Sequence, residues 1–190
     1  MPKLLFLAGS ARRESLNKKL VHIAAELAEK KGCKASVVDL NLFQMPIYDG
    51  DYEDDKGIPD TAILLKKVFQ DHDGIFISSP EYNSSFSPLL KNALDWISRP
   101  HEENEPSLSA YRGKIAALAS ISPGGLGGLR GLVPLRMMLG NIGVTVIPQQ
   151  VAIGNGVSAF NEEGTLSDER QAQMLEATID ELINTTRPFI

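Results

Sequence analysis

The sequence has one cysteine, three histidines and no long run of apolar residues, and each shortage excludes a class of protein. The single cysteine, Cys33, permits neither an internal disulfide nor a cysteine-rich metal site, and no histidine has a partner pattern that suggests a metal. No apolar stretch approaches the roughly 20 residues that cross a bilayer, so we expect no membrane partner. The N-terminus lacks the features of a signal peptide. We therefore expect a cytoplasmic protein.

Basic residues are also too few for a nucleic-acid partner. The chain has 19 Lys and Arg against 24 Asp and Glu, for a net charge of −5, and its basic residues form no run. Its 190 residues, of which 43% are hydrophobic, can bury a substantial core. We expect residues 1–190 to form a single domain.

Short apolar runs alternate with segments whose apolar residues recur at helical spacing. The runs predict strands over residues 4–8, 35–40, 75–79, 113–120 and 144–147. The intervening patterns predict helices that begin near Leu16, Asp60, Ser87, Leu129 and Ser167. Such alternation is typical of an α/β fold, with a doubly wound parallel sheet and helices on both faces. Ligands of such folds bind outside the carboxyl ends of the strands.

The turn after the first strand, residues 9–17, reads Gly-Ser-Ala-Arg-Arg-Glu-Ser-Leu-Asn. It precedes a helix, whose N-terminus offers unpaired N–H groups to an anion. Ser10, Ser15 and Asn17 add donors, and Arg12 adds a planar fork suited to phosphate. A phosphate cradle is one interpretation. The other is a plain turn in which Ser15 only caps the helix.

Two more unusual loops follow the third and fourth strands. Residues 80–83, Pro-Glu-Tyr-Asn, offer backbone groups, an aromatic ring and an amide that can line a flat heteroaromatic ring. Residues 122–128, Ser-Pro-Gly-Gly-Leu-Gly-Gly, allow close backbone approach to a planar ligand. Taken singly, each could be ordinary turn or linker chemistry. Together with the first loop they describe a mononucleotide site, and FMN suits it well.

Three other features carry open alternatives. The connection over residues 41–57 is acidic, but it lacks the spacing of a calcium-binding EF-hand, and a solvated loop is the better interpretation. Pro134 interrupts a helical pattern, so that helix either begins late or kinks. Trp96 has helical spacing typical of core or interface packing.

Three motifs resemble those of the NADPH-dependent FMN reductase family of flavodoxin-like proteins. The family pattern G-S-x-R-x-x-S-x-N matches residues 9–17. The pattern P-E-Y-N, followed by L-K-N-A-x-D-W, matches residues 80–83 and 90–96. A Ser/Gly turn before a helix with L-R matches residues 120–128 with Leu135 and Arg136. The resemblance spans nearly the whole chain and implies a five-stranded parallel sheet of order 2-1-3-4-5.

The resemblance also implies a site and a reaction. Ser10, Arg12, Ser15 and Asn17 would hold the FMN phosphate. The isoalloxazine would lie against the second and third loops, namely Pro80, Glu81, Tyr82 and Asn83, with Ser120 or Ser122 and Gly124 on its pyrimidine side. NADPH or NADH would reduce FMN, which would pass two electrons to quinones, azo compounds, metal oxyanions or free flavin, with no essential catalytic side chain.

Family members are usually homodimers or homotetramers with FMN near the interface, which would give the helix of Trp96 a partner surface. Arg13 and Arg99 are candidates for the 2′-phosphate of NADPH. Two other classes stay open: a flavodoxin-type electron carrier without its own NADPH oxidation, and a regulatory protein on the same fold, with or without flavin.

Overall fold

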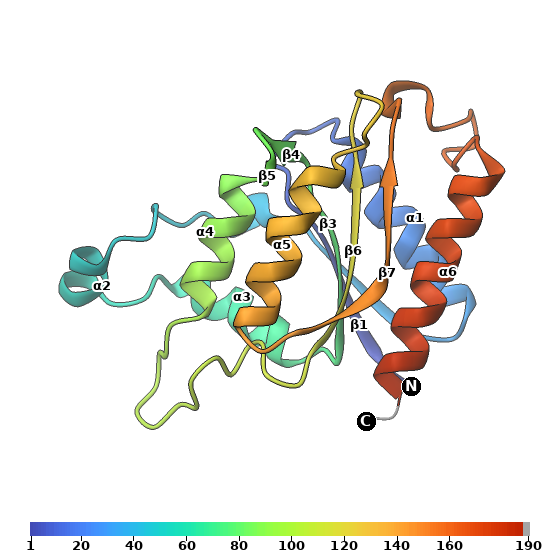
Figure 1. Cartoon of the computed structure of the whole chain (residues 1–190). Helices are drawn as coiled ribbons and strands as arrows, with labels where there is room; N and C mark the ends of the chain where they lie inside the picture. Colours follow the sequence, from blue (N-terminus) through green and yellow to red (C-terminus); the bar gives the residue numbers. More distant parts are fainter. Residues whose placement is uncertain (188–190) are drawn as a thin grey trace.

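The computed structural model describes residues 1–187, which form a parallel sheet with helices on both faces (Figure 1). The main sheet has five strands in the order β2-β1-β3-β6-β7. Their bounds are β1 Lys3–Ala8, β2 Lys34–Val38, β3 Gly74–Ser78, β6 Ile115–Ile121 and β7 Thr145–Ile153. Counting only these strands, this is the predicted order 2-1-3-4-5. The prediction of a flavodoxin-like fold is therefore confirmed.

Six α-helices and two 3₁₀ turns accompany the strands within residues 1–187. The helices are α1 Leu16–Lys30, α2 Gly50–Lys56, α3 Asp60–Gln70, α4 Pro88–Ile97, α5 Leu129–Asn141 and α6 Glu169–Thr186, and the 3₁₀ turns are η1 Leu40–Leu42 and η2 Gly156–Ser158. Two short strands, β4 Glu81–Tyr82 and β5 Ser85–Phe86, form an antiparallel pair beside the main sheet. No helix within residues 1–187 is both long and apolar enough to span a bilayer.

The sheet separates two hydrophobic cores. Alternate residues of a strand point to opposite faces, so Leu4 and Phe6 pack against α1 and α6 while Leu5 and Leu7 pack against α3, α4 and α5. Strand β3 is buried along its whole length, as its unbroken apolar sequence predicts for a central strand. Both faces are thus covered by helices, and the carboxyl ends of the strands stay open for a ligand.

Strand β7 is longer than the predicted strand of residues 144–147, because it continues through Pro148 to Ile153. Its pairing with β6 is irregular between Ala116 and Leu118. This bulge accommodates Pro148, which has no N–H to donate to a regular ladder. The Arg136 guanidinium donates to the carbonyl oxygens of Val146, Ile147 and Pro148 and to Gln150 Oε1. The arginine of the L-R pattern therefore stabilises an edge strand rather than a ligand.

Several helix boundaries also differ from the predicted ones. Asp60 does not cap α3: Pro59 occupies the N-cap position, and Asp60 is the first helical residue. The N-cap of α6 is Asp168, one residue after the predicted Ser167. Helix α5 begins at Leu129 with Pro134 inside it, so its start is not delayed. Propensity places helix ends only to within a residue or two.

The acidic connection of residues 41–57 is partly helical, contrary to its prediction as a loop. Asp49 caps the seven-residue helix α2, which has no buried residue and projects from the body of the molecule (Figure 1). Residues 46–58, which we call the acidic arm, cover Trp96, which is completely buried. The Trp96 indole N–H donates to the Pro46 carbonyl oxygen at 2.7 Å, and Tyr48 and Tyr52 contact its ring edge-on. Trp96 therefore offers no surface to a partner, and its role is core packing.

Candidate functional site at the carboxyl edge of the sheet

The three unusual loops all leave the sheet at its carboxyl edge, as predicted. Backbone hydrogen bonds extend the strand pairing into each of them: Gly9 N donates to Ser78 O, Ser79 N to Ala119 O, and Ser122 N to Ile153 O, at 2.9–3.1 Å. Each loop therefore begins from a fixed position on its neighbour, and the three form one rigid rim.

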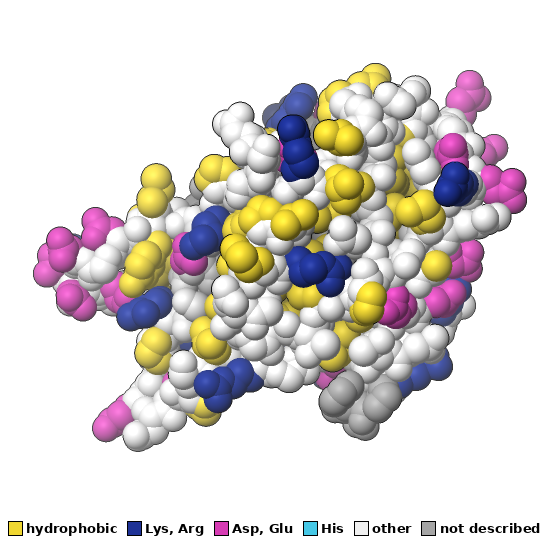
Figure 2. Space-filling view, in the orientation of Figure 1, with side chains coloured by type: hydrophobic (Ala, Val, Ile, Leu, Met, Phe, Trp, Pro, Cys, Tyr) yellow, Lys and Arg dark blue, Asp and Glu magenta, His cyan; other side chains and the backbone are white. Residues whose placement is uncertain are grey.

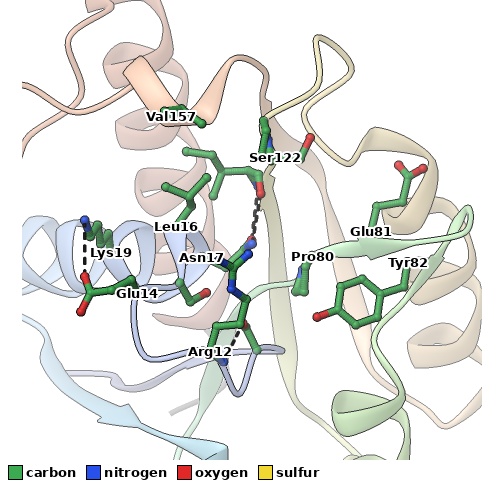
Figure 3. A pocket seen from close by; sticks show the side chains of 14 residues that line it. Arg12, Glu14, Leu16, Asn17, Lys19, Pro80, Glu81, Tyr82, Ser122 and Val157 are labelled. Carbon is green, nitrogen blue, oxygen red and sulfur yellow. Dashed lines mark hydrogen bonds and ion pairs between the residues drawn. The ribbon is translucent and has the colours of Figure 1, made fainter.

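The first loop presents free donors around the start of α1. Ser15 is the N-cap, and its side chain accepts a hydrogen bond from Lys18 N. Within residues 1–187, the backbone N–H groups of Leu16 and Asn17 have no acceptor, and the Arg12 guanidinium has neither an ion pair nor a hydrogen bond. Figure 3 shows Arg12 extending across the opening beside Asn17. Unpaired N–H groups and a free arginine at a helix N-terminus are suited to bind an anion.

Two contacts on the side facing β2 and η1 hold the first loop in place. Lys18 Nζ lies 2.7 Å from the Asp39 carboxylate, and Asn41 donates to the Ala11 carbonyl oxygen at 2.7 Å. Burial alone would raise the pKa of Asp39, but the hydrogen bonds from Lys18 and from the backbone N–H of Asn41 outweigh it, so the pKa lies below its ordinary value. Asp39 stays ionised near neutral pH and keeps Lys18 directed away from the cleft.

The second loop is a tight hairpin rather than an open turn. Asn83 and Ser84 adopt positive φ angles of 51° and 66° between β4 and β5, as a two-residue hairpin of type I′ requires. The Glu81 carboxylate binds Arg130 of α5, with Oε1 2.6 Å from Nη2 and 2.8 Å from Nε. The loop is thereby fixed to the first turn of α5, and Tyr82 is left half exposed at its tip.

The third loop needs its glycines for two different reasons. At Gly127, with φ +63°, an added Cβ would lie 2.5 Å from the Ile153 backbone; at Gly128, with φ +84°, it would lie 1.9 Å from the Ser120 hydroxyl oxygen. These two glycines allow close packing and a left-handed backbone. Gly125, in contrast, meets no heavy atom within 4 Å, and Gly124 meets only the Ser122 hydroxyl at 3.9 Å. That half of the loop is open to a ligand.

A cleft of about 420 Å³ lies between the three loops (Figure 3). Most of the predicted site residues line it, namely Ser10, Arg12, Ser15, Asn17, Pro80, Glu81, Tyr82 and Ser122. Gly124 lines an adjoining cavity of about 310 Å³, which shares Glu81 and Ser122 with the cleft. Segments more than one hundred residues apart thus meet in one place. The combined space is in the range of cofactor sites.

Two predicted residues lie outside both cavities. Asn83 is at the exposed hairpin tip. Ser120 is completely buried against Gly128, and its hydroxyl has no hydrogen-bond partner among residues 1–187. Of the alternatives Ser120 and Ser122, only Ser122 reaches the cleft. Arg99, a candidate for a 2′-phosphate, binds Glu53 and lies over the Tyr48 ring on the arm, away from the cleft.

Sequence reasoning missed part of the lining. Val157 of η2 lines the cleft, opposite the second loop in Figure 3, although residues 154–158 carry only a Gly/Asn loop signal. These residues support the third loop, since Gly156 N donates to Ser122 O and Asn155 N to Gly124 O. Lys19 also lines the cleft, with its ammonium 4.0 Å from Glu14. Its place one turn into the helix could have indicated a second cation near the anion site.

Comparisons with known proteins agree with this geometry. Residues 2–158 match the family model described as NADPH-dependent FMN reductase. The chain is 32% identical over 179 residues to a 2-hydroxy-1,4-benzoquinone reductase of a Burkholderia species, covering 94% of this chain and 92% of that protein. It is 31% identical over 175 residues to a quinone reductase of Pseudomonas putida, covering 92% and 89%.

A solved structure extends the similarity to the whole fold. FerB, a flavoenzyme NAD(P)H:(acceptor) oxidoreductase from Paracoccus denitrificans, superimposes with a TM-score of 0.83 at 27% identity, covering 100% of this chain and 99% of that one. The family match covers all three loops, and the relatives align over nearly the full chain. This chain belongs to the NADPH-dependent FMN reductase family.

Proposed function

We propose that this protein is an FMN-dependent NAD(P)H oxidoreductase whose acceptors include quinones. The observation that carries the proposal is the meeting of a free arginine, a helix N-terminus and an open glycine loop around one cleft. Relatives named as quinone reductases, at 31–32% identity, support the acceptor class. Azo compounds, metal oxyanions and free flavin are further acceptors that we propose from the family resemblance. We propose that the whole chain forms a single FMN-binding domain.

The residues of the first loop fit the phosphate of FMN. The N–H groups of Leu16 and Asn17 and the hydroxyls of Ser10 and Ser15 would donate to its oxygens, and Arg12 would neutralise its charge. Ser10 and Ser15 are almost fully buried, whereas Arg12 is exposed. The two hydroxyls would therefore bind the phosphate from the floor of the cleft, and the guanidinium would cover its solvent-facing side.

The second and third loops fit a flat heterocycle. Pro80, Glu81 and Tyr82 form one wall, with the Glu81 backbone fixed through the ion pair of its side chain with Arg130. The open backbone of Gly124 and the Ser122 hydroxyl would meet the polar edge of the ring. Asn83 and Ser120 would act indirectly, by shaping the hairpin and by packing on Gly128.

Bound FMN would supply the redox chemistry, namely hydride acceptance from NAD(P)H and two-electron transfer to the acceptor. The chain binds and orients the ring and provides backbone N–H groups where negative charge develops. We assign no side chain as general acid, base or nucleophile. The openness of the cleft beside Tyr82 would let a nicotinamide and an acceptor use the same space in turn.

The test is a pair of arginine variants. Arg12→Ala should lower FMN affinity about 10- to 100-fold, since a charge-assisted hydrogen bond contributes about 1.5–3 kcal/mol. Arg13→Ala, an exposed neighbour outside the cleft, should bind FMN like the parent. Fluorescence titration with FMN gives both affinities. An Arg12→Ala protein that binds FMN as tightly as the parent would show that the phosphate is held elsewhere.

A kinetic assay distinguishes the enzyme from an electron carrier. The parent should oxidise NADPH or NADH in the steady state when a quinone such as 1,4-benzoquinone is present, and the rate should depend on bound FMN. A flavodoxin-type carrier would bind FMN but would not consume the reduced nucleotide. A regulatory protein without flavin would show no flavin absorbance.

We further propose a homodimer or homotetramer that works in the cytoplasm. Four apolar side chains, Leu126, Leu129, Val133 and Met137, are 43–66% exposed beside the cleft, and the last three recur every four residues on one face of α5. Figure 2 shows hydrophobic side chains gathered over this part of the surface. An exposed apolar stripe supports a protein interface. Cys33, a buried free thiol, is compatible with a reducing compartment.

A further inference from the structure

Asn17 lies in the phosphate motif, but its side chain is almost entirely engaged with the protein. The residue is 4% exposed. Its Oδ1 accepts hydrogen bonds from the Ser78 hydroxyl at 2.8 Å and from Ile121 N at 3.2 Å, and its Nδ2 donates to Ile121 O at 3.1 Å. A primary amide has two acceptor positions and two donors. Three of the four are occupied, so only one N–H remains for any ligand.

The partners of this amide lie at the point where β3 has ended and β6 continues without a partner strand on that side. Ser79 N donates to Ala119 O, which is the last backbone hydrogen bond between β3 and β6. Beyond it, β3 turns away into the second loop while β6 continues to Ile121. The N–H and C=O of Ile121 on that side therefore have no strand to pair with. The Asn17 amide binds both groups and takes the place of the missing strand.

This position connects all three loops of the cleft. Asn17 is in the first turn of α1, at the end of the first loop; Ser78 precedes the second loop; and Ile121 precedes Ser122, which lines both cavities. Buried hydrogen bonds between rigid elements hold a fixed spacing, because breaking one leaves an unpaired buried group. The amide thus sets the distance between the phosphate-binding end and the ring-binding end.

We infer that Asn17 is a positioning residue, whose side chain aligns the third loop with the first instead of serving as a main phosphate ligand. The inference rests on the proposed FMN site. A phosphate ligand would distinguish FMN from riboflavin, which lacks the phosphate. A residue that positions the ring-binding loop affects both flavins equally.

The experiment measures dissociation constants of FMN and riboflavin for the flavin-free full-length chain by fluorescence titration. Asn17→Ala should raise both constants by the same factor, about tenfold, as expected for unpaired buried groups. Arg12→Ala should raise the FMN constant and leave the riboflavin constant within about twofold. Visible circular dichroism of the bound flavin should change in Asn17→Ala and not in Arg12→Ala, because it reports the setting of the ring.

Ser78→Ala is the second variant, useful where Asn17→Ala does not fold. Ser78 lines neither cavity and cannot contact a ligand there, yet its hydroxyl binds the Asn17 amide. Ser78→Ala should raise the dissociation constants of FMN and riboflavin equally, by about threefold, because it removes one hydrogen bond.

Three results would overturn the inference. In Asn17→Ala, the FMN constant could rise at least tenfold more than the riboflavin constant, which would make Asn17 a phosphate ligand. Both constants and the dichroism could stay unchanged while the melting temperature falls, which would make the amide merely structural. A parent chain that binds neither flavin would overturn the proposed cofactor site, and this inference with it.

Discussion

At the scale of single residues, the least expected feature is a buried lysine far from the cleft. Lys66 of α3 is 2% exposed, and its ammonium binds the carboxylate of Glu105 and the carbonyl oxygen of Arg99. Glu105 also accepts a hydrogen bond from the backbone N–H of His101 at 2.7 Å, and the same carboxylate oxygen lies 2.8 Å from Nδ1 of the His101 ring. This ion pair fixes the irregular segment of residues 98–112 onto α3.

We predict that Glu105→Gln lowers the free energy of unfolding by about 3–5 kcal/mol, because it leaves the Lys66 charge buried without a counter-ion. Urea denaturation at pH 7 measures the loss. Glu102→Gln, at a neighbouring carboxylate with 71% of its side chain exposed, should change stability by less than about 0.5 kcal/mol. Equal losses in the two variants would contradict a special role for Glu105.

The same pair predicts a pH dependence. Burial alone would raise the pKa of Glu105, but hydrogen bonds from Lys66, Ser109 and the His101 backbone lower it from 4.5 to about 2. A carboxyl whose pKa is lower in the folded state stabilises the protein above its unfolded pKa, and the effect disappears as pH falls through the folded value. The stability difference between parent and Glu105→Gln should therefore shrink between pH 4.5 and 2.

At the scale of elements, helix α4 carries the L-K-N-A-x-D-W motif but uses it to hold the acidic arm. Asn92 accepts a hydrogen bond from Tyr48 N and donates one to Pro46 O, both at 2.8 Å, and Trp96 donates to the same carbonyl oxygen. Arg99, just beyond the helix, binds Glu53 of α2. The motif residues that face the arm are thus anchors for residues 46–53.

We predict that Asn92→Ala loosens this arm without loss of flavin binding. It removes two hydrogen bonds from the arm backbone, so stability should fall by about 1–3 kcal/mol and protease cleavage within residues 46–58 should become faster. Limited proteolysis with mass spectrometry locates the cuts. Lys91→Ala, which removes only an exposed pair with Asp95 on the same helix, is the matched control and should cleave like the parent.

At the scale of the whole molecule, the apolar stripe formed by Leu126 of the third loop and by Leu129, Val133 and Met137 of α5 is the surface we expect a second copy to cover. It borders the cavity lined by Gly124, so an interface there would lie next to the proposed position of the flavin ring. Association would remove these side chains from water at a gain of about 25 cal/mol per Å² of apolar area.

We predict that Val133→Glu with Met137→Glu shifts the protein toward monomers in sedimentation velocity. Two carboxylates per chain on an apolar interface would carry a desolvation cost that association cannot recover. Both positions are exposed in the single chain, so its melting temperature as a monomer should hardly change. Glu substitutions at Leu42 and Leu64, exposed apolar residues elsewhere, serve as the control. An unchanged sedimentation profile would place the interface on another surface.

The amino-acid sequence by itself determined the alternation of strands and helices and the place of the cleft, whereas the strand order came from the family resemblance. Unbroken apolar runs, helical spacing and three atypical turns are local signals, and parallel strands bring their carboxyl ends to one edge whatever their side chains. For this reason the sequence alone assigns Arg12, Tyr82 and Ser122 to one site.

Only the tertiary structure decided which side chains of that site are free to bind. The Asn17 amide and the Ser120 hydroxyl are polar groups that could bind a ligand. The amide instead replaces a missing strand, and the hydroxyl is packed against Gly128. Val157 joined the lining through a loop without a motif, and Trp96 was covered by an arm fifty residues earlier in the chain. Whether a polar group faces a ligand depends on which distant backbone groups still need hydrogen bonds, and that need exists only once the chain is folded.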